Sequence, residues 1–120
     1  MTIDRYGLVN EPGRPCMSLA LATDCWMTVC ATAPERVPDV ADQTRQVLDI
    51  LDYYLEESGV SMDDGLLTAM VWLKDITDYA AMNDVWNDWI GERSAPVRCC
   101  LQANMARPEM LVEIKLIAAR

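Results

Sequence analysis

Residues 94–116 read SAPVRCCLQANMARPEMLVEIKL, and the interpretation of the whole sheet depends on this stretch. Two apolar segments, about 97–102 and 111–118, predict two strands joined by a more polar connection. The first segment contains Arg98 and the second contains Glu113. A charged group in a half-buried strand loses hydration, which a partner or a ligand has to replace. Both charges therefore need a structural or a functional reason.

Alternation of side chains along a strand assigns these residues to faces. Successive side chains point to opposite faces, so we predict one apolar row of each strand in the core. The predicted core rows are Val97, Cys99 and Leu101 in the first strand, and Val112, Ile114, Leu116 and Ala118 in the second. The predicted opposite rows are Arg98, Cys100 and Gln102, with Leu111, Glu113, Lys115 and Ile117. Arg98 and Glu113 are thus expected on the same face of the sheet.

The predicted second face combines these charges with apolar side chains. Its apolar members are Cys100, Leu111 and Ile117, joined by Met70 and Trp72 of another strand. An exposed apolar patch of this kind is typical of a subunit contact. We therefore expect a homo-oligomer whose sheets meet on this face, with Arg98 and Glu113 at or near the contact.

The sequence leaves two explanations for Arg98 open. Arg98 and Glu113 can form an ion pair with each other or across a subunit contact, and such a pair is weak evidence of stabilisation. Alternatively, the planar guanidinium group of Arg98 binds the carboxylate of a ligand in a bidentate manner. The residue pattern does not discriminate between the two explanations.

Upstream, the pattern predicts a hairpin followed by a long helix. Residues 17–30 predict two short strands that turn at Thr23 and Asp24. Residues 39–58 place apolar side chains at helical spacing and are followed by Gly59, a favoured residue at the end of a helix. We expect this helix to pack its apolar side against the sheet.

The middle of the chain predicts one more strand and a second helix. Residues 66–73 are apolar enough for a buried strand, and a helix is expected from Thr77 or Asp78 to near Gly91. The resulting order is ββαβαββ within a single domain, residues 1–120. This order predicts an α+β fold, in which a mostly antiparallel sheet has two helices on one face.

The composition narrows the classes of function. Nineteen acidic and ten basic side chains give a net charge of −9, which disfavours nucleic acid as a partner. No window approaches the roughly 20 apolar residues of a membrane span, and no secretory signal is evident, so we expect a cytoplasmic protein without a membrane partner. The absence of histidine excludes Ser-His-Asp and Cys-His nucleophilic pairs. The five cysteines, without a CxxC motif, are expected to be reduced thiols.

Four separated motifs carry a family resemblance: QTRQVLD at 43–49, YAAMND at 79–84, APVRC at 95–99 and VEIKLIAA at 112–119. In this order and spacing they resemble the Rid family of reactive-intermediate deaminases, also called the YjgF type and historically labelled endoribonuclease L-PSP. The chain is most similar to the branch that combines APVRC with VEIK. The resemblance implies a chorismate-mutase-like fold, assembled as a homotrimer around a central barrel of sheets, with a ligand pocket in each cleft between subunits.

The resemblance also implies an activity, the hydrolysis of 2-imino acids or their enamine tautomers to 2-oxo acids and ammonia. Arg98 matches the family arginine that binds the substrate carboxylate, and Glu113 matches the glutamate that positions the attacking water. Cys100 matches a cysteine that lines the pocket, and Asn83 matches an asparagine near the same cleft. A protonated imine is already electrophilic, so the reaction needs a bound carboxylate, a placed water and a proton acceptor. We therefore expect a small carboxylate substrate such as 2-iminobutanoate or 2-iminopropanoate, with no metal and no cofactor.

The N-terminal half departs from the family pattern. Many deaminating members have a Ser-Gly-Gln turn after the second strand and a tyrosine in the first loop, where this chain has CAT at 30–32 and RPC at 14–16. The altered loop motivates an alternative function, a non-catalytic trimeric binder or sensor of small carboxylates such as 2-oxo acids. Ribonuclease activity is a third possibility, which the acidic charge and the absence of histidine disfavour.

Overall fold

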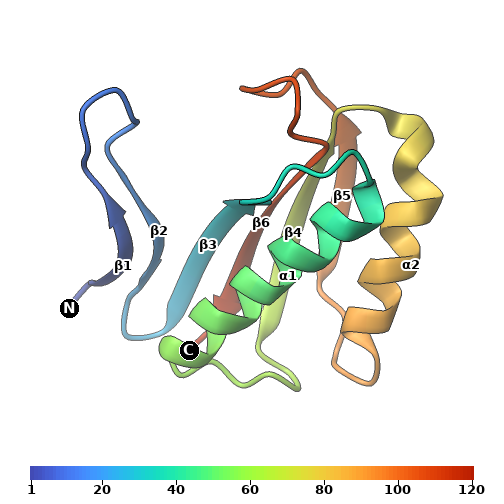
Figure 1. The fold of residues 1–120 in the computed structure, drawn as a ribbon. Coiled ribbons are helices and arrows are strands. Elements are labelled where there is room, and N and C mark those ends of the chain that lie inside the picture. The colour runs from blue at the N-terminus through green and yellow to red at the C-terminus, as the bar shows by residue number, and fades with distance from the viewer.

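A computed structural model describes residues 1–120 and contains one six-stranded sheet with two α-helices (Figure 1). The strands are β1 Asp4–Val9, β2 Met17–Ala22, β3 Trp26–Thr32, β4 Leu66–Leu73, β5 Val97–Gln102 and β6 Val112–Ala119. The helices are α1 Val40–Glu57 and α2 Tyr79–Ile90, with a short 3-10 turn, Ile76–Asp78, before α2. The predicted hairpin, both helices and the last three strands are confirmed.

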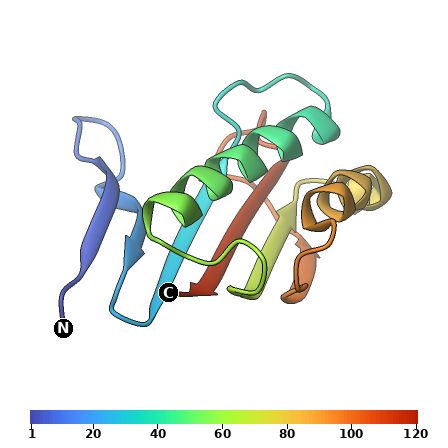
Figure 2. The same cartoon turned by 90° about the horizontal axis from the view of Figure 1, so that it is seen from below.

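The strands lie in the order β1-β2-β3-β6-β4-β5. Every neighbouring pair is antiparallel except β4 and β5, which are parallel because α2 carries the chain back along the sheet between them. The predicted mostly antiparallel α+β sheet is therefore confirmed. Both helices lie on the same face of the sheet (Figure 2).

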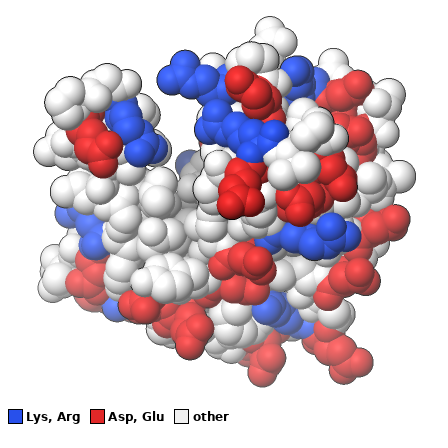
Figure 3. Space-filling view, viewed as in Figure 1, with Lys and Arg blue, Asp and Glu red and all other residues white.

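The N-terminal strand β1 was not predicted, so the observed order has one strand more than expected. β1 pairs only with β2, and only Val9 among its residues is buried. An edge strand with so few buried side chains has little apolar alternation to signal it. The β1–β2 hairpin projects beside the rest of the sheet, and a notch separates its tip from the loops at the same end of the molecule (Figure 3).

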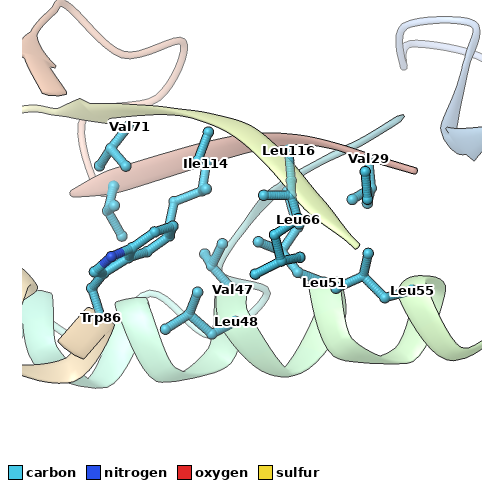
Figure 4. Close-up of a cluster of buried hydrophobic side chains, with 14 of the residues drawn as sticks. Val29, Val47, Leu48, Leu51, Leu55, Leu66, Val71, Trp86, Ile114 and Leu116 are labelled. Atoms are coloured by element: carbon cyan, nitrogen blue, oxygen red, sulfur yellow. The ribbon is translucent and has the colours of Figure 1, made fainter. Parts of the chain in front are cut away.

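Helix α1 forms where the sequence predicts it. The Asp39 side chain accepts a hydrogen bond of 3.0 Å from the backbone N–H of Ala41 and caps the first turn. Gly59, with φ of +75°, follows the last turn in a left-handed conformation that favours glycine. The buried side of α1 packs on the centre of the sheet (Figure 4). Its fully buried members include Val47, Leu48, Leu51 and Leu55.

The inner face of the sheet completes the core beneath the helices. In β6 the side chains of Val112, Ile114, Leu116 and Ala118 are fully buried, as predicted. Helix α2 adds Met82, Val85 and Trp86 to the same cluster. No helix in the structure is both long enough and apolar enough to cross a membrane.

The predicted core row of β5 is wrong. Val97 is 77% exposed and Leu101 is 54% exposed, and Cys99 is also exposed. The parallel register places Arg98 beside Ala69 and Cys100 beside Val71, so these two side chains lie on the helix-covered face. Alternation was the correct rule, but the more apolar row of this edge strand faces outward.

Candidate active site

Glu113 lies on the outer face of the sheet, where it lines a hollow of about 240 Å³. Its neighbours in register are Thr32 on β3 and Trp72 on β4. The hollow is lined by Cys30, Trp72 and Glu113 of the sheet, with residues 103–106 of the β5–β6 connection. A half-buried carboxylate beside a small cavity is a suitable group to accept a proton from a water molecule held there.

Cys30 holds one oxygen of this carboxylate. Its Sγ donates a hydrogen bond of 3.3 Å to Oε2 of Glu113. Burial, followed by the negative charge of Glu113, raises the pKa of the Cys30 thiol to about 12. The thiol therefore stays protonated and acts as a donor, and it is not an activated nucleophile. In the sequence Cys30 stands out only as a departure from the family turn. The side-chain alternation of β3 and β6 was the signal that could have paired it with Glu113.

Arg98 lies on the helix-covered face, against α2. Its Nη2 donates to the hydroxyl of Tyr79 at 3.3 Å, and its Nη1 lies 3.8 Å from Sδ of Met82. The guanidinium carbon also lies 5.3 Å from the ring centroid of Trp86. These contacts orient the guanidinium group without neutralising its charge.

No carboxylate of the chain pairs with Arg98. The ion pairs present are Arg14–Glu11, Arg93–Asp52 and Arg120–Asp4. An ion pair between Arg98 and Glu113 within one chain is therefore contradicted. None of the five surface hollows of the single chain is lined by Arg98.

The prediction that Arg98 and Glu113 share a face is wrong. Arg98 belongs to the buried row that contains Ala69 and Leu116, whereas Glu113 belongs to the outer row that contains Trp72 and Leu101. The structure therefore does not bring the two predicted functional charges together in one chain. The error follows directly from the outward apolar row of β5.

Asn83 lies on α2 beside the residues that hold Arg98. It is four residues from Tyr79 and three from Trp86, so it shares their side of the helix. Its Oδ1 is buried and accepts no hydrogen bond. A buried acceptor without a donor costs about 1–3 kcal/mol, so this oxygen is suited to a donor from outside the chain.

Cys100 follows Arg98 on the same row of β5 and is half buried against the core. Burial raises the pKa of the Cys100 thiol, and the opposing effect of the Arg98 charge is smaller. The positive charge of Arg98 does lower this pKa, but burial outweighs it. Cys100 therefore stays a neutral thiol, which lies beside Arg98 as a packing group and not as a nucleophile.

The outer face of the sheet carries an exposed apolar strip. Its exposed members on β4 and β5 are Met70, Val97 and Leu101, and the half-buried Trp72 lies in the same row. Met70 is 38% exposed and borders Cys99 in register. The outer face is thus apolar as predicted, although Cys100 and Leu111 pack against the core.

The comparisons with known proteins agree on one family. The family model described as Endoribonuclease L-PSP matches residues 28–120. The chain is 42% identical over 81 residues to the RutC family protein YoaB of Escherichia coli, covering 68% of this chain and 70% of that protein. It is 35% identical over 82 residues to the 3-aminoacrylate deaminase RutC of Acinetobacter baylyi, covering 68% of this chain and 64% of the relative.

Solved structures support the same conclusion. A member of the YjgF protein family from Neisseria meningitidis superposes with a TM-score of 0.87 at 33% identity, covering 100% of this chain and 96% of that one. Because the family model spans residues 28–120, which include α1, α2, β5 and β6, and a relative covering two thirds of the chain is 42% identical, the chain belongs to the Rid/YjgF/RutC family, whose family model carries the description Endoribonuclease L-PSP.

Proposed function

We propose that the protein hydrolyses reactive 2-imino acids, or their enamine tautomers, to 2-oxo acids and ammonia. Membership of the Rid/YjgF/RutC family supports this function, as does similarity to a relative named 3-aminoacrylate deaminase. The observation that carries this proposal is that the candidate polar groups lie on the two opposite faces of the sheet. On one face of the sheet Arg98 has no carboxylate partner and the Oδ1 of Asn83 has no donor, and on the other face Glu113 borders a hollow.

The site is completed between two copies of the chain. A single sheet separates Arg98 from Glu113, whereas a neighbouring copy can present its β5 edge and α2 to the hollow beside Glu113. The exposed strip of Met70, Val97 and Leu101 is the surface suited to that contact. A homotrimer around a central barrel of sheets, as the family resemblance implies, repeats this cleft three times.

The reaction needs few groups in such a cleft. Arg98 binds the substrate carboxylate, and Asn83 accepts a hydrogen bond from the protonated imine nitrogen. Glu113 accepts a proton from water as the water oxygen attacks the imine carbon, forming a carbinolamine. The same carboxyl then returns the proton to nitrogen. As ammonia leaves, the Glu113 carboxylate accepts the proton of the hydroxyl group, and the carbonyl forms. The Cys30 thiol bonded to Oε2 leaves Oε1 of Glu113 for the water.

An imine-trapping assay tests the proposal. 2-Iminopropanoate or 2-iminobutanoate is generated in place by serine or threonine dehydratase, and surviving imine is trapped with semicarbazide. Wild type is expected to reduce trapping, and Arg98→Ala to lose about a hundredfold in activity because the carboxylate loses its charged partner. Arg45→Ala, an exposed arginine of α1, is the matched control. Equal trapping with wild type, Arg98→Ala and no protein refutes deamination of these substrates.

The alternative is a trimer that binds small carboxylates without turning them over. The replacement of the usual turn and loop residues by CAT and RPC favours it. Saturable binding of 2-oxobutanoate by wild type, lost in Arg98→Ala, together with no imine hydrolysis, supports this alternative.

A further inference from the structure

Three arginines line a second hollow, next to the one that contains Glu113. This hollow has a volume of about 490 Å³, and we call it the arginine hollow after Arg14, Arg36 and Arg107. The three residues come from the β1–β2 loop, the β3–α1 connection and the β5–β6 connection. It lies in the notch between the hairpin and the loops, where basic side chains gather on both sides (Figure 3). Distant parts of the chain thus bring three cations to one small space.

The charge of this hollow is unlike that of the rest of the molecule. Acidic side chains outnumber basic ones by nineteen to ten, yet three of the ten basic residues line the arginine hollow and no acidic residue does. The side chains of Arg36 and Arg107 form no ion pair. Arg14 has only Glu11 at 3.9 Å, and both of these side chains are largely exposed. The guanidinium groups therefore keep donors and charge available for an anion.

The arginine hollow adjoins the Glu113 hollow. Ala106 lines both, and Thr32, which lines the arginine hollow, is the register partner of Glu113 across β3 and β6. One small molecule that places its reacting carbon beside Glu113 can therefore reach the arginine hollow with its far end. Arg98 of a neighbouring copy remains the partner of the carboxylate next to the reacting carbon.

We infer that the substrate carries a second anionic group, a carboxylate or a phosphate, and that Arg14, Arg36 and Arg107 bind it. The inference rests on the proposed function. The substrate class is a 2-imino acid with a compact oxyanion at its far end, such as 2-iminosuccinate. The second group sets selectivity, because a substrate without it leaves three cations without a counter-anion.

The first test compares the kcat/KM for an imine with two carboxylate groups with the kcat/KM for an imine with one. 2-Iminosuccinate is generated from D-aspartate by D-aspartate oxidase and 2-iminopropanoate from D-alanine by D-amino acid oxidase, with catalase present. Wild type is expected to have a kcat/KM at least about tenfold higher for 2-iminosuccinate. That ratio is expected to fall about tenfold in Arg36→Gln and in Arg107→Gln, and to stay unchanged in Arg45→Gln. Equal kcat/KM values for both imines in wild type overturn the inference and leave the proposed function standing.

The second test does not depend on turnover. Calorimetry measures the binding of succinate, inorganic phosphate and propanoate to wild type, to Arg36→Gln/Arg107→Gln and to Arg45→Gln. Succinate or phosphate is expected to bind more tightly than propanoate, and the double variant is expected to lose that advantage. The tighter of the two anions identifies the second group as carboxylate or phosphate. Succinate or phosphate binding that the double variant retains overturns the inference. If the double variant loses this binding and the wild type hydrolyses no imine, the anion site is upheld and the deaminase function is refuted.

Discussion

The thiol of Cys30 donates a hydrogen bond of 3.3 Å to Oε2 of Glu113, across the paired strands β3 and β6. This contact places a neutral donor against the carboxylate that the proposed reaction uses. Burial, and after it the negative charge of Glu113, raises the pKa of the Cys30 thiol to about 12. The contact has a consequence that can be measured chemically, without a substrate.

Alkylation by iodoacetamide at pH 8 is expected to be much slower at Cys30 than at the exposed Cys25. The raised pKa lowers the thiolate fraction at this pH by about a thousandfold, and only the thiolate reacts. Mass spectrometry of peptides from timed samples measures both rates. In Glu113→Gln the rate at Cys30 is expected to rise, because the negative charge that contributes to the high pKa is gone. Equal rates for Cys30 and Cys25 in the native protein contradict the buried pair, and equal rates in denaturant are the control.

Leu101→Asp is expected to prevent assembly while leaving the fold of each chain intact. Leu101 is 54% exposed on the outer face, so a charge there costs little in one chain but is desolvated in a subunit contact. Sedimentation velocity and circular dichroism measure the two properties separately. Val37→Asp, at a residue 46% exposed on the β3–α1 connection, is the matched control and is expected to keep the wild-type assembly. A Leu101→Asp variant with the oligomeric state of wild type contradicts the proposed contact.

Asn83→Leu is expected to lower deaminase activity about tenfold without lowering the free energy of unfolding. The Oδ1 of Asn83 is buried without a donor, so replacing the amide with an apolar group of similar size removes an unsatisfied acceptor from the chain. Activity then falls because the substrate nitrogen loses its acceptor. Imine trapping and urea denaturation measure the two effects.

Asn87→Leu, an exposed position one turn later on α2, controls for the new apolar side chain. Asn83→Leu with wild-type activity refutes the role of this residue in the site. A loss of unfolding free energy well beyond that of Asn87→Leu indicates a structural role instead.

Residue patterns predicted the elements that bury many side chains. Helix α1 follows from the helical spacing of Val47, Leu51 and Leu55 and from the break at Gly59, all of which involve neighbours in the sequence. The inner row of β6 follows in the same way, because a central strand buries one whole row. The short edge strand β1 escaped prediction because its partner, and not its own pattern, keeps it in the sheet.

The sequence by itself therefore determined the helices, the central strands and the identity of the charged residues, because these depend on local spacing and residue type. Only the tertiary structure decided on which face Arg98 lies, since β5 is an edge strand whose apolar row, Val97 and Leu101, faces outward. It alone paired Cys30 with Glu113 and gathered Arg14, Arg36 and Arg107 around one hollow. Such contacts join residues far apart in the chain, and the register between strands and the course of the loops determine them, not the spacing within a segment.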